Sequence, residues 1–157
     1  MEKSSRVSVI LSFRNEAEVI PELIRRLQVA LRSVPVDYEL IFVNDDSSDR
    51  SLEILKKSAQ EDRGIKVITM SRRFGVSECA LAGMQYAKGD AVVYMDADLQ
   101  DPPEVIPQLI AKWREGADVV HTVRSRREGE STLKLTLTDA AYHLISSWAD
   151  APLVLEA

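Results

Sequence analysis

The sequence predicts an α/β domain with a mostly parallel sheet and helices on both of its faces. Short apolar runs alternate with longer stretches in which apolar residues recur at helical spacing, from residue 7 to about residue 148. The short runs are almost continuously apolar, which is typical of strands that helices cover on both sides. With 157 residues, the chain is expected to form one domain, residues 1–157, around a single core.

Five apolar runs, rich in β-branched residues and too short for helices, are predicted to be strands. They are residues 7–13, 38–43, 65–70, 91–95 and 117–123. Five stretches with apolar side chains three and four residues apart are predicted to be helices. They are residues 20–31, 52–59, 76–87, 105–113 and 133–148.

Residues between these elements have side chains or backbone preferences that start or stop helices. Asn15 is expected to cap the first helix, and Pro35 follows its predicted end. Gly64 and Gly116 are expected to end the second and fourth helices, and Gly89 is expected to act as the C-cap of the third.

Composition and charge narrow the class of protein. The chain is 45% hydrophobic and 29% charged, as in ordinary globular proteins. Its net charge of −5 argues against nucleic-acid binding, which normally requires a basic excess. Cys79 is the only cysteine and is expected to be a buried, unreactive thiol. No run is apolar enough to span a membrane and residues 1–6 lack a signal-peptide core, so a cytoplasmic location is expected.

Polar side chains follow each predicted strand at its carboxyl end, the edge at which open parallel sheets bind ligands. In chain order these residues are Ser12, Arg14, Asn15, Glu16, Asn44, Asp45, Asp46, Arg72, Arg73, Asp96, Asp98, Gln100, Arg124, Arg126 and Arg127. Because a purely structural chain has no need to place so many charges on one edge, this clustering favours a binding site over simple turns and helix caps.

Asp96 and Asp98 are the strongest candidates for chemistry. Two residues apart in extended chain, they point to the same side and would repel each other there. A divalent cation removes this repulsion, and with Gln100 the oxygen-only ligands suit Mg²⁺ or Mn²⁺ rather than zinc. The alternative interpretation is an aspartate-rich turn that only caps the following helix.

Acidic residues with a metal ion, beside arginines, suit a diphosphate whose charge must be held during a reaction. The metal would bridge the phosphates, and arginines such as Arg73 would clamp phosphate oxygens. Asp45 suits a hydrogen bond from a base or a ribose instead of a metal. The basic residues 124–127 are consistent either with phosphate binding or with a solvated loop.

Four stretches, taken together and in this order, resemble a known family. They are residues 9–16, 43–49, 71–75 and 95–104. The chain resembles the family 2 glycosyltransferases of the Rossmann-like GT-A fold, and within them the dolichyl- or polyprenyl-phosphate sugar transferases. The likeness runs from about residue 7 to residue 150.

The resemblance implies metal-dependent transfer of a sugar, with inversion, from a nucleotide-diphosphate sugar to a polyprenyl phosphate. It assigns Asp45 to the uracil or guanine base, and Asp96, Asp98 and Gln100 to the diphosphate and its metal. The substrate-binding residues expected on this basis are Ser12, Arg14, Glu16, Asp45, Arg73, Asp96, Arg124, Arg127 and Ser131. Arg124, Arg127 and Ser131 match the loop that grips the lipid phosphate.

The sequence departs from the family pattern at several places. Arg14 stands where an aromatic residue is usual, Asn44 and Asp46 replace an Asp and a Gly, and Val76 replaces a Lys. The family's further C-terminal acceptor motif, amphipathic helix and membrane helices are expected to be absent. Peripheral attachment to the cytoplasmic face of a membrane, and a homodimer through the apolar residues 151–155, are expected instead.

Two other functions compete with this interpretation. One is a nucleotide-sugar-binding module without turnover, or a truncated remnant of an enzyme. The other is a phospho-accepting signalling domain, which would place its acidic pair after the first strand, where this chain has Ser12 to Glu16.

Overall fold

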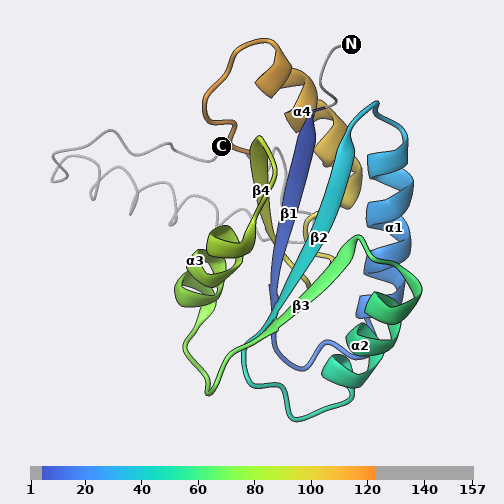
Figure 1. Ribbon diagram of the computed structural model, residues 1–157, viewed down its shortest axis with the longest axis vertical. Helices are drawn as coiled ribbons and strands as arrows, with labels where there is room; N and C mark the ends of the chain where they lie inside the picture. Colours follow the sequence, from blue (N-terminus) through green and yellow to red (C-terminus); the bar gives the residue numbers. More distant parts are fainter. Residues whose placement is uncertain (1–4, 123–157) are drawn as a thin grey trace, which may run out of the picture. The chain divides into compact units, whose positions relative to one another are not determined.

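The computed structural model describes residues 5–122. Within them, four strands form one sheet in the order β3-β2-β1-β4, and all neighbouring strands are parallel (Figure 1). The strands are β1 Arg6–Phe13, β2 Asp37–Asn44, β3 Ile65–Thr69 and β4 Ala91–Asp96. Because all four run in the same direction, their carboxyl ends lie along one edge of the sheet.

Helices cover both faces of this sheet, as the sequence predicts (Figure 1). They are α1 Ile20–Arg32, α2 Ser51–Glu61, α3 Val76–Tyr86 and α4 Ile106–Arg114, with the short 3₁₀ helix η1 Pro103–Val105 before α4. α1, α2 and α4 share one face, and α3 lies on the other, against β1 and β2. The predicted α/β fold with a parallel sheet is therefore confirmed.

The central strands β1 and β2 are largely apolar because helices pack against both of their faces. Val9 and Leu11 of β1 pack in the core shared with α1, α2 and α4. Ile10, between them in sequence, packs with Ile41, Val43 and Cys79 beneath α3. Successive strand side chains alternate between faces, so both sets of side chains are buried in such a strand, and a polar side chain there needs a hydrogen-bond partner.

α3 approaches the sheet closely at Gly83. A Cβ atom at this position would lie 2.3 Å from Cγ2 of Ile10 and 3.3 Å from Cγ2 of Val43. Only a residue without a side chain fits at this distance, so Gly83 sets the separation between α3 and the sheet.

A buried acid joins the amino-terminal halves of three strands. Glu39 of β2 is 4% exposed and accepts hydrogen bonds from Ser8 Oγ at 2.6 Å, Lys88 N at 2.6 Å and Lys66 Nζ at 2.5 Å. Burial acts to raise the pKa of Glu39, but these donors together outweigh it and hold the pKa below its ordinary value. The charge is therefore paired, and it ties β1 and β3 to β2.

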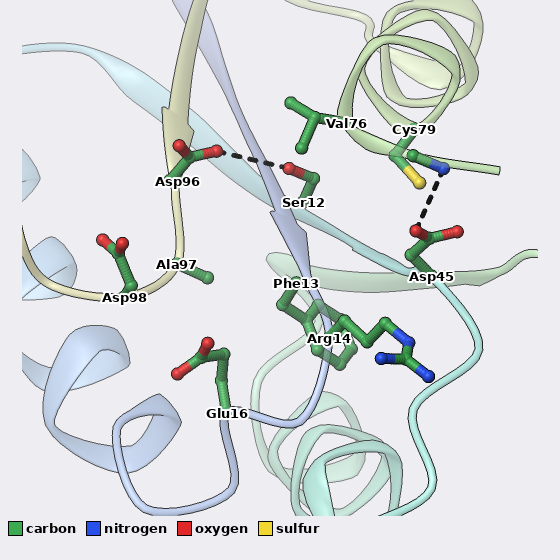
Figure 2. A pocket seen from close by; sticks show the side chains of 11 residues that line it. Ser12, Phe13, Arg14, Glu16, Asp45, Val76, Cys79, Asp96, Ala97 and Asp98 are labelled. Carbon is green, nitrogen blue, oxygen red and sulfur yellow. Dashed lines mark hydrogen bonds between the residues drawn. The ribbon is translucent and has the colours of Figure 1, made fainter. Parts of the chain in front are cut away.

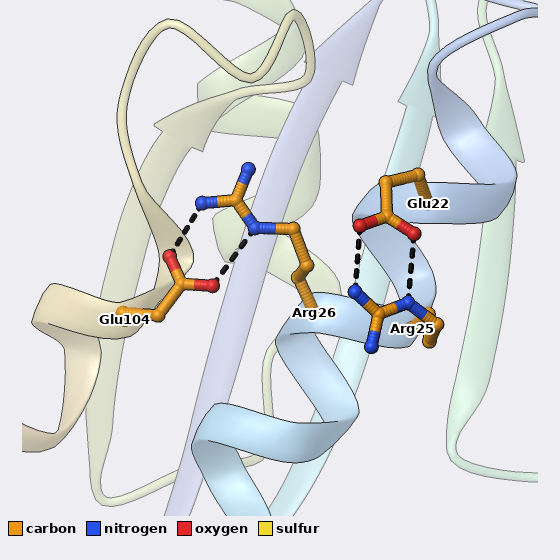
Figure 3. Close-up of polar contacts among 4 residues, drawn as sticks. All are labelled: Glu22, Arg25, Arg26 and Glu104. Carbon is orange, nitrogen blue, oxygen red and sulfur yellow. Dashed lines mark hydrogen bonds and ion pairs between the residues drawn. The ribbon is translucent and has the colours of Figure 1, made fainter.

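Two ion pairs on α1 differ in what they connect (Figure 3). Glu22 and Arg25 pair within one turn of the helix. Arg26 reaches across to Glu104 of η1 through two bonds of 2.8 and 2.6 Å, and this pairing lowers the pKa of Glu104 to about 2. The second pair joins elements far apart in the sequence.

Three local predictions are wrong. Asn15 does not cap α1, whose N-cap is Val19; its backbone has φ +59° and its side chain bonds to the loop after β2. Gly89 is not the C-cap of α3, which is Ala87; a Cβ at Gly89 would lie 2.6 Å from the backbone nitrogen of Ser8.

The third concerns the predicted fifth strand, which is not formed over residues 117–122. Val119 is 71% exposed there, so the burial that favours a strand at these valines is missing. Of the described residues, 5–118 belong to one compact unit, and 119–122 belong to a second, which begins at Val119. In the described residues, no helix is long and apolar enough to cross a membrane.

Candidate functional site

A pocket of about 220 Å³ opens at the carboxyl edge of the sheet (Figure 2). Its walls come from the ends of β1, β2 and β4 and from the start of α3. Six of the residues predicted for the site line it: Ser12, Arg14, Glu16, Asp45, Asp96 and Asp98. The strand ends thus bring together residues that lie up to 86 positions apart in the sequence.

The pocket is strongly acidic. Of its 11 lining residues, Glu16, Asp45, Asp96 and Asp98 are acidic and Arg14 alone is basic. Burial raises the pKa of Glu16, and the nearby charges of Asp98 and Asp49 add to this effect. Such a cluster is stabilised by a bound cation, because the cation favours the ionised form of every carboxylate around it.

Asp45 is anchored by the loop before α3. Its two carboxylate oxygens accept hydrogen bonds from the backbone nitrogens of Phe74, at 2.7 Å, and Gly75, at 3.0 Å. Gly75 has φ +104°, a conformation that glycine adopts without strain. A carboxylate has about four acceptor positions, so Asp45 keeps capacity for a donor from a ligand.

Cys79 lies beside Asp45 and is fully buried. Burial, followed by the charge of Asp45, raises the pKa of its thiol to about 11. The thiol is therefore protonated at neutral pH, which confirms the expectation of a buried cysteine; its low reactivity stays a prediction.

Asp96 ends β4 beside two hydroxyl groups. Tyr94 Oη lies 3.2 Å from Asp96 Oδ1 and 2.9 Å from Ser12 Oγ, and Ser12 Oγ lies 3.5 Å from Asp96 Oδ1. Burial is the main reason that the pKa of Tyr94 is raised. Sequence reasoning assigned Tyr94 to the apolar strand and did not identify it as part of the site.

Asp98 lies just beyond β4, where the chain turns sharply. Leu99 has φ +60°, and this turn lets the backbone nitrogen of Gln100 donate to Asp98 Oδ1 at 2.9 Å. The Gln100 side chain is exposed and does not line the pocket. The structure thus brings Asp96 and Asp98 together but leaves Gln100 at the margin.

A network of hydrogen bonds fixes the loop after β1 against the loop after β2. Asp49 Oδ2 accepts from Ala17 N at 3.1 Å, and Ser51 Oγ accepts from Glu16 N at 2.8 Å. Asn15 N donates to Ser47 Oγ at 3.0 Å, and Asn15 Oδ1 accepts from Ser48 N at 2.8 Å. Ser47, Ser48 and Asp49 were named only within the stretch 43–49 and Ser51 was not singled out, whereas all four fix the loop that carries Arg14 and Glu16.

The remaining predicted residues lie elsewhere. Arg73 is exposed and is not among the pocket-lining residues. The neighbouring Arg72 stacks over the ring of Phe74 at 4.7 Å. Arg124, Arg127, Ser131 and the apolar residues 151–155 fall outside the described part of the chain.

The carboxylates of the pocket are compatible with a metal ion whose remaining ligands come from the bound substrate. Within residues 5–122, no three His, Cys, Asp or Glu side chains are grouped so as to hold a metal ion by themselves. Asp96 and Asp98 offer two carboxylates on one wall of the pocket. Mg²⁺ is commonly held by one or two carboxylates, with substrate phosphates and water as the other ligands.

Comparison with known protein families identifies the family to which this chain belongs. Residues 8–148 match the family described as Glycosyl transferase family 2. The chain belongs to this family, and its sheet is that of the GT-A type.

Two curated relatives illustrate the similarity. One is the "Uncharacterized glycosyltransferase YkcC" of Bacillus subtilis, 42% identical over 156 residues, which cover 99% of this chain and 48% of that protein. The other is the "Undecaprenyl-phosphate 4-deoxy-4-formamido-L-arabinose transferase" of Salmonella choleraesuis, 44% identical over 124 residues, covering 78% of this chain and 38% of that protein. The chain therefore spans less than half the length of these relatives.

Solved structures share the fold at low sequence identity. A mannosyltransferase from Pyrobaculum calidifontis, in complex with GDP-Man and Mn²⁺, has a TM-score of 0.62 at 21% identity and covers 80% of this chain and 37% of its own. Residues 1–349 of TarS from S. aureus, in complex with UDP-GlcNAc, have a TM-score of 0.59 at 22% identity. The match covers 78% of this chain and 38% of the TarS chain.

Proposed function

We propose that the protein of this chain transfers a sugar from a nucleotide-diphosphate sugar to a polyprenyl phosphate, with inversion and with Mg²⁺ or Mn²⁺. The observation that carries the proposal is the acidic pocket at the carboxyl edge of the sheet, with Asp96 and Asp98 on one side and Asp45 on the other (Figure 2). The family, and the relative named for undecaprenyl phosphate, support it.

The two sides of the pocket suit two parts of the donor. Asp45, anchored by Phe74 and Gly75, accepts an N–H of the base. Asp96 and Asp98 would hold the cation that neutralises the diphosphate, with Gln100 at the margin of the pocket. Arg14 is available to a phosphate oxygen or to the face of the base, because guanidinium both pairs with anions and stacks. When bound, a divalent ion would supply electrostatic stabilisation of the charge that develops on the diphosphate.

The acceptor needs little activation. An oxygen of the acceptor phosphate forms a bond to the anomeric carbon while the bond from that carbon to the nucleoside diphosphate breaks, and the electron pair leaves with the diphosphate. Attack from the opposite face inverts the configuration. Because the second pKa of a phosphate monoester is about 6, the acceptor is ionised at neutral pH and requires no general base.

The acceptor side of the proposal rests on residues outside the described structure. Arg124, Arg127 and Ser131 are assigned to the lipid phosphate, and Arg73 to a phosphate of either substrate. A lipid acceptor implies peripheral association with the cytoplasmic face of a membrane. A homodimer is a separate prediction, which light scattering tests; a monomer at every concentration would contradict it.

A binding experiment followed by a transfer assay tests the proposal. We expect UDP-glucose, GDP-mannose or UDP-GlcNAc to give a saturable calorimetric signal with Mn²⁺. The donor that binds is then labelled in its sugar and incubated with undecaprenyl phosphate in detergent, and the lipid fraction is counted. Label in the lipid supports transfer, whereas binding without label identifies a nucleotide-sugar-binding module. Absence of binding by all three donors would contradict the proposal.

A further inference from the structure

Three polar side chains share one face of the sheet at the end of β4. Ser12 and Asp96 are register partners across β1 and β4, and Tyr94 precedes Asp96 by two residues on the same strand. Side chains two apart in a strand point to the same face, so the two hydroxyls and the carboxylate lie next to one another. Tyr94 is 37% exposed and is not among the residues that line the pocket.

The distances fix the direction of the hydrogen bonds. Ser12 Oγ and Tyr94 Oη are 2.9 Å apart, Tyr94 Oη and Asp96 Oδ1 are 3.2 Å apart, and Ser12 Oγ and Asp96 Oδ1 are 3.5 Å apart. Each hydroxyl has a single proton to donate. The two shorter contacts are satisfied together only if Ser12 donates to Tyr94 and Tyr94 donates to Asp96. The third distance, at 3.5 Å, is too long for a strong bond.

This chain of hydrogen bonds leaves the two oxygens of Asp96 in different situations. Oδ1 receives the Tyr94 hydroxyl, and no group among residues 5–122 donates a hydrogen bond to Oδ2. A donor on one oxygen restricts rotation of the carboxylate and directs its other oxygen. Partners that orient metal-binding carboxylates in this way commonly change metal affinity 10- to 100-fold when removed.

We infer that Tyr94 is a positioning residue, which orients Asp96 through Oδ1 so that Oδ2 is presented to the divalent cation, and that Ser12 acts on Asp96 through Tyr94. The inference rests on the proposed metal site. It changes the role expected for Ser12, from direct contact with the nucleotide sugar to support of Tyr94.

Tyr94→Phe removes one hydroxyl and leaves the ring in place. Because Asp96 and Asp98 offer only two carboxylates, binding of Mn²⁺ is followed by calorimetry in the presence of the nucleoside diphosphate that binds, UDP or GDP, with a titration of Mn²⁺ into that nucleotide alone as the blank. We expect the dissociation constant for Mn²⁺ to rise about tenfold, at the lower end of the range for such partners because Tyr94 is part-exposed. Tyr86→Phe, on the exposed side of α3, is the matched control and should bind Mn²⁺ like the wild type.

A double-mutant cycle tests whether Ser12 acts on Asp96 through the hydroxyl of Tyr94. Ser12→Ala alone should weaken Mn²⁺ binding by less than Tyr94→Phe does, and it should have no further effect in the Tyr94→Phe background. Additive losses would show that Ser12 acts on Asp96 independently. The melting temperature of each variant, measured without metal, should match the wild type, which separates positioning from a loss of folding.

The outcomes distinguish the inference from the proposal on which it rests. If the wild type binds Mn²⁺ and Asp98→Asn does not, but Tyr94→Phe binds as the wild type does, Tyr94 has no positioning role. If Asp98→Asn and the wild type bind Mn²⁺ equally, the metal site itself is wrong. Weaker binding by Tyr94→Phe, with Tyr86→Phe unchanged, supports the inference.

Discussion

The side chain of Asn15 and the backbone of Ser48 join the two loops that carry the candidate site. Ser48 N donates to Asn15 Oδ1 at 2.8 Å, and Asn15 holds φ +59°, which places its amide toward the second loop. Asn is among the few residues that adopt this conformation readily. Arg14 and Glu16 flank Asn15, so this contact fixes pocket residues from β1 relative to Asp45 at the end of β2.

Two substitutions at Asn15 separate backbone conformation from hydrogen bonding. Asn15→Gly keeps the left-handed conformation and loses the side-chain bond, so we expect a destabilisation of about 1 kcal/mol. Asn15→Ala loses the bond and also strains the backbone, so about 2–3 kcal/mol is expected. Urea unfolding measures both; equal effects would show that the left-handed conformation is not required.

The substitution Gly83→Ala tests how closely α3 packs on the sheet, because the change in stability expected here is opposite to that in an exposed helix. In an exposed helix, Gly→Ala stabilises by about 1 kcal/mol. At Gly83 the added methyl group would lie 2.3 Å from Ile10 Cγ2, so we expect Gly83→Ala to destabilise the fold by about 1–3 kcal/mol. Gln85→Ala, on the exposed side of the same helix, is the control. A stabilised Gly83→Ala variant would mean that α3 lies farther from the sheet.

Glu39 should make stability depend on pH in the acid range. Its pKa is lower in the folded state than the ordinary 4.5, so its contribution is complete above that value and is lost as pH falls through the folded-state pKa. Glu39→Gln should therefore be less stable than wild type at pH 7, and the difference should shrink below pH 4.5. A difference that stays constant down to pH 3 would contradict the pairing of Glu39 with Lys66 and Ser8.

The pKa of Glu16 is shifted upward, so its effect on the pH dependence of stability is opposite to that of Glu39. Its pKa is raised by burial and by the neighbouring acids, so its ionised form opposes folding above that pKa, and the penalty vanishes below 4.5. Glu16→Gln is expected to unfold at a higher temperature than wild type at pH 7 and at the same temperature at pH 4. Addition of Mn²⁺ should reduce the advantage at pH 7, because a cation removes the same repulsion. A less stable variant at pH 7 would contradict the electrostatic strain described for the pocket.

The sequence was sufficient for most of the fold because a strand covered on both faces has a simple pattern. The runs at 7–13 and 38–43 became β1, Arg6–Phe13, and β2, Asp37–Asn44, within one residue at each end. The run at 117–123 has the same apolar character, but residues 117–122 form no strand. Apolar composition predicts that a segment can form a strand, and not that it is buried; Val119 is 71% exposed.

The site was predictable to the extent that it depends on strand ends. Asp45, Asp96 and Asp98 were expected at one edge and line one pocket. Contacts between loops were not predictable, because spacing rules say nothing about which loop a serine or an asparagine will meet. Tyr94 was missed for another reason: in an apolar run its hydroxyl carries no signal that distinguishes it from a packing residue.

The central claim is that a divalent cation, held by Asp96 and Asp98, binds the diphosphate of the donor. Calorimetric titration of the donor nucleoside diphosphate tests it in Mn²⁺ and in EDTA, with wild type, Asp98→Asn and Asp37→Asn. Asp37 is an exposed acid at the start of β2, the end of that strand away from the pocket, and serves as the matched control. We expect wild type and Asp37→Asn to bind in Mn²⁺ and to lose binding in EDTA, and Asp98→Asn to bind in neither. Equal affinity in Mn²⁺ and in EDTA, or wild-type affinity for Asp98→Asn, would contradict the claim.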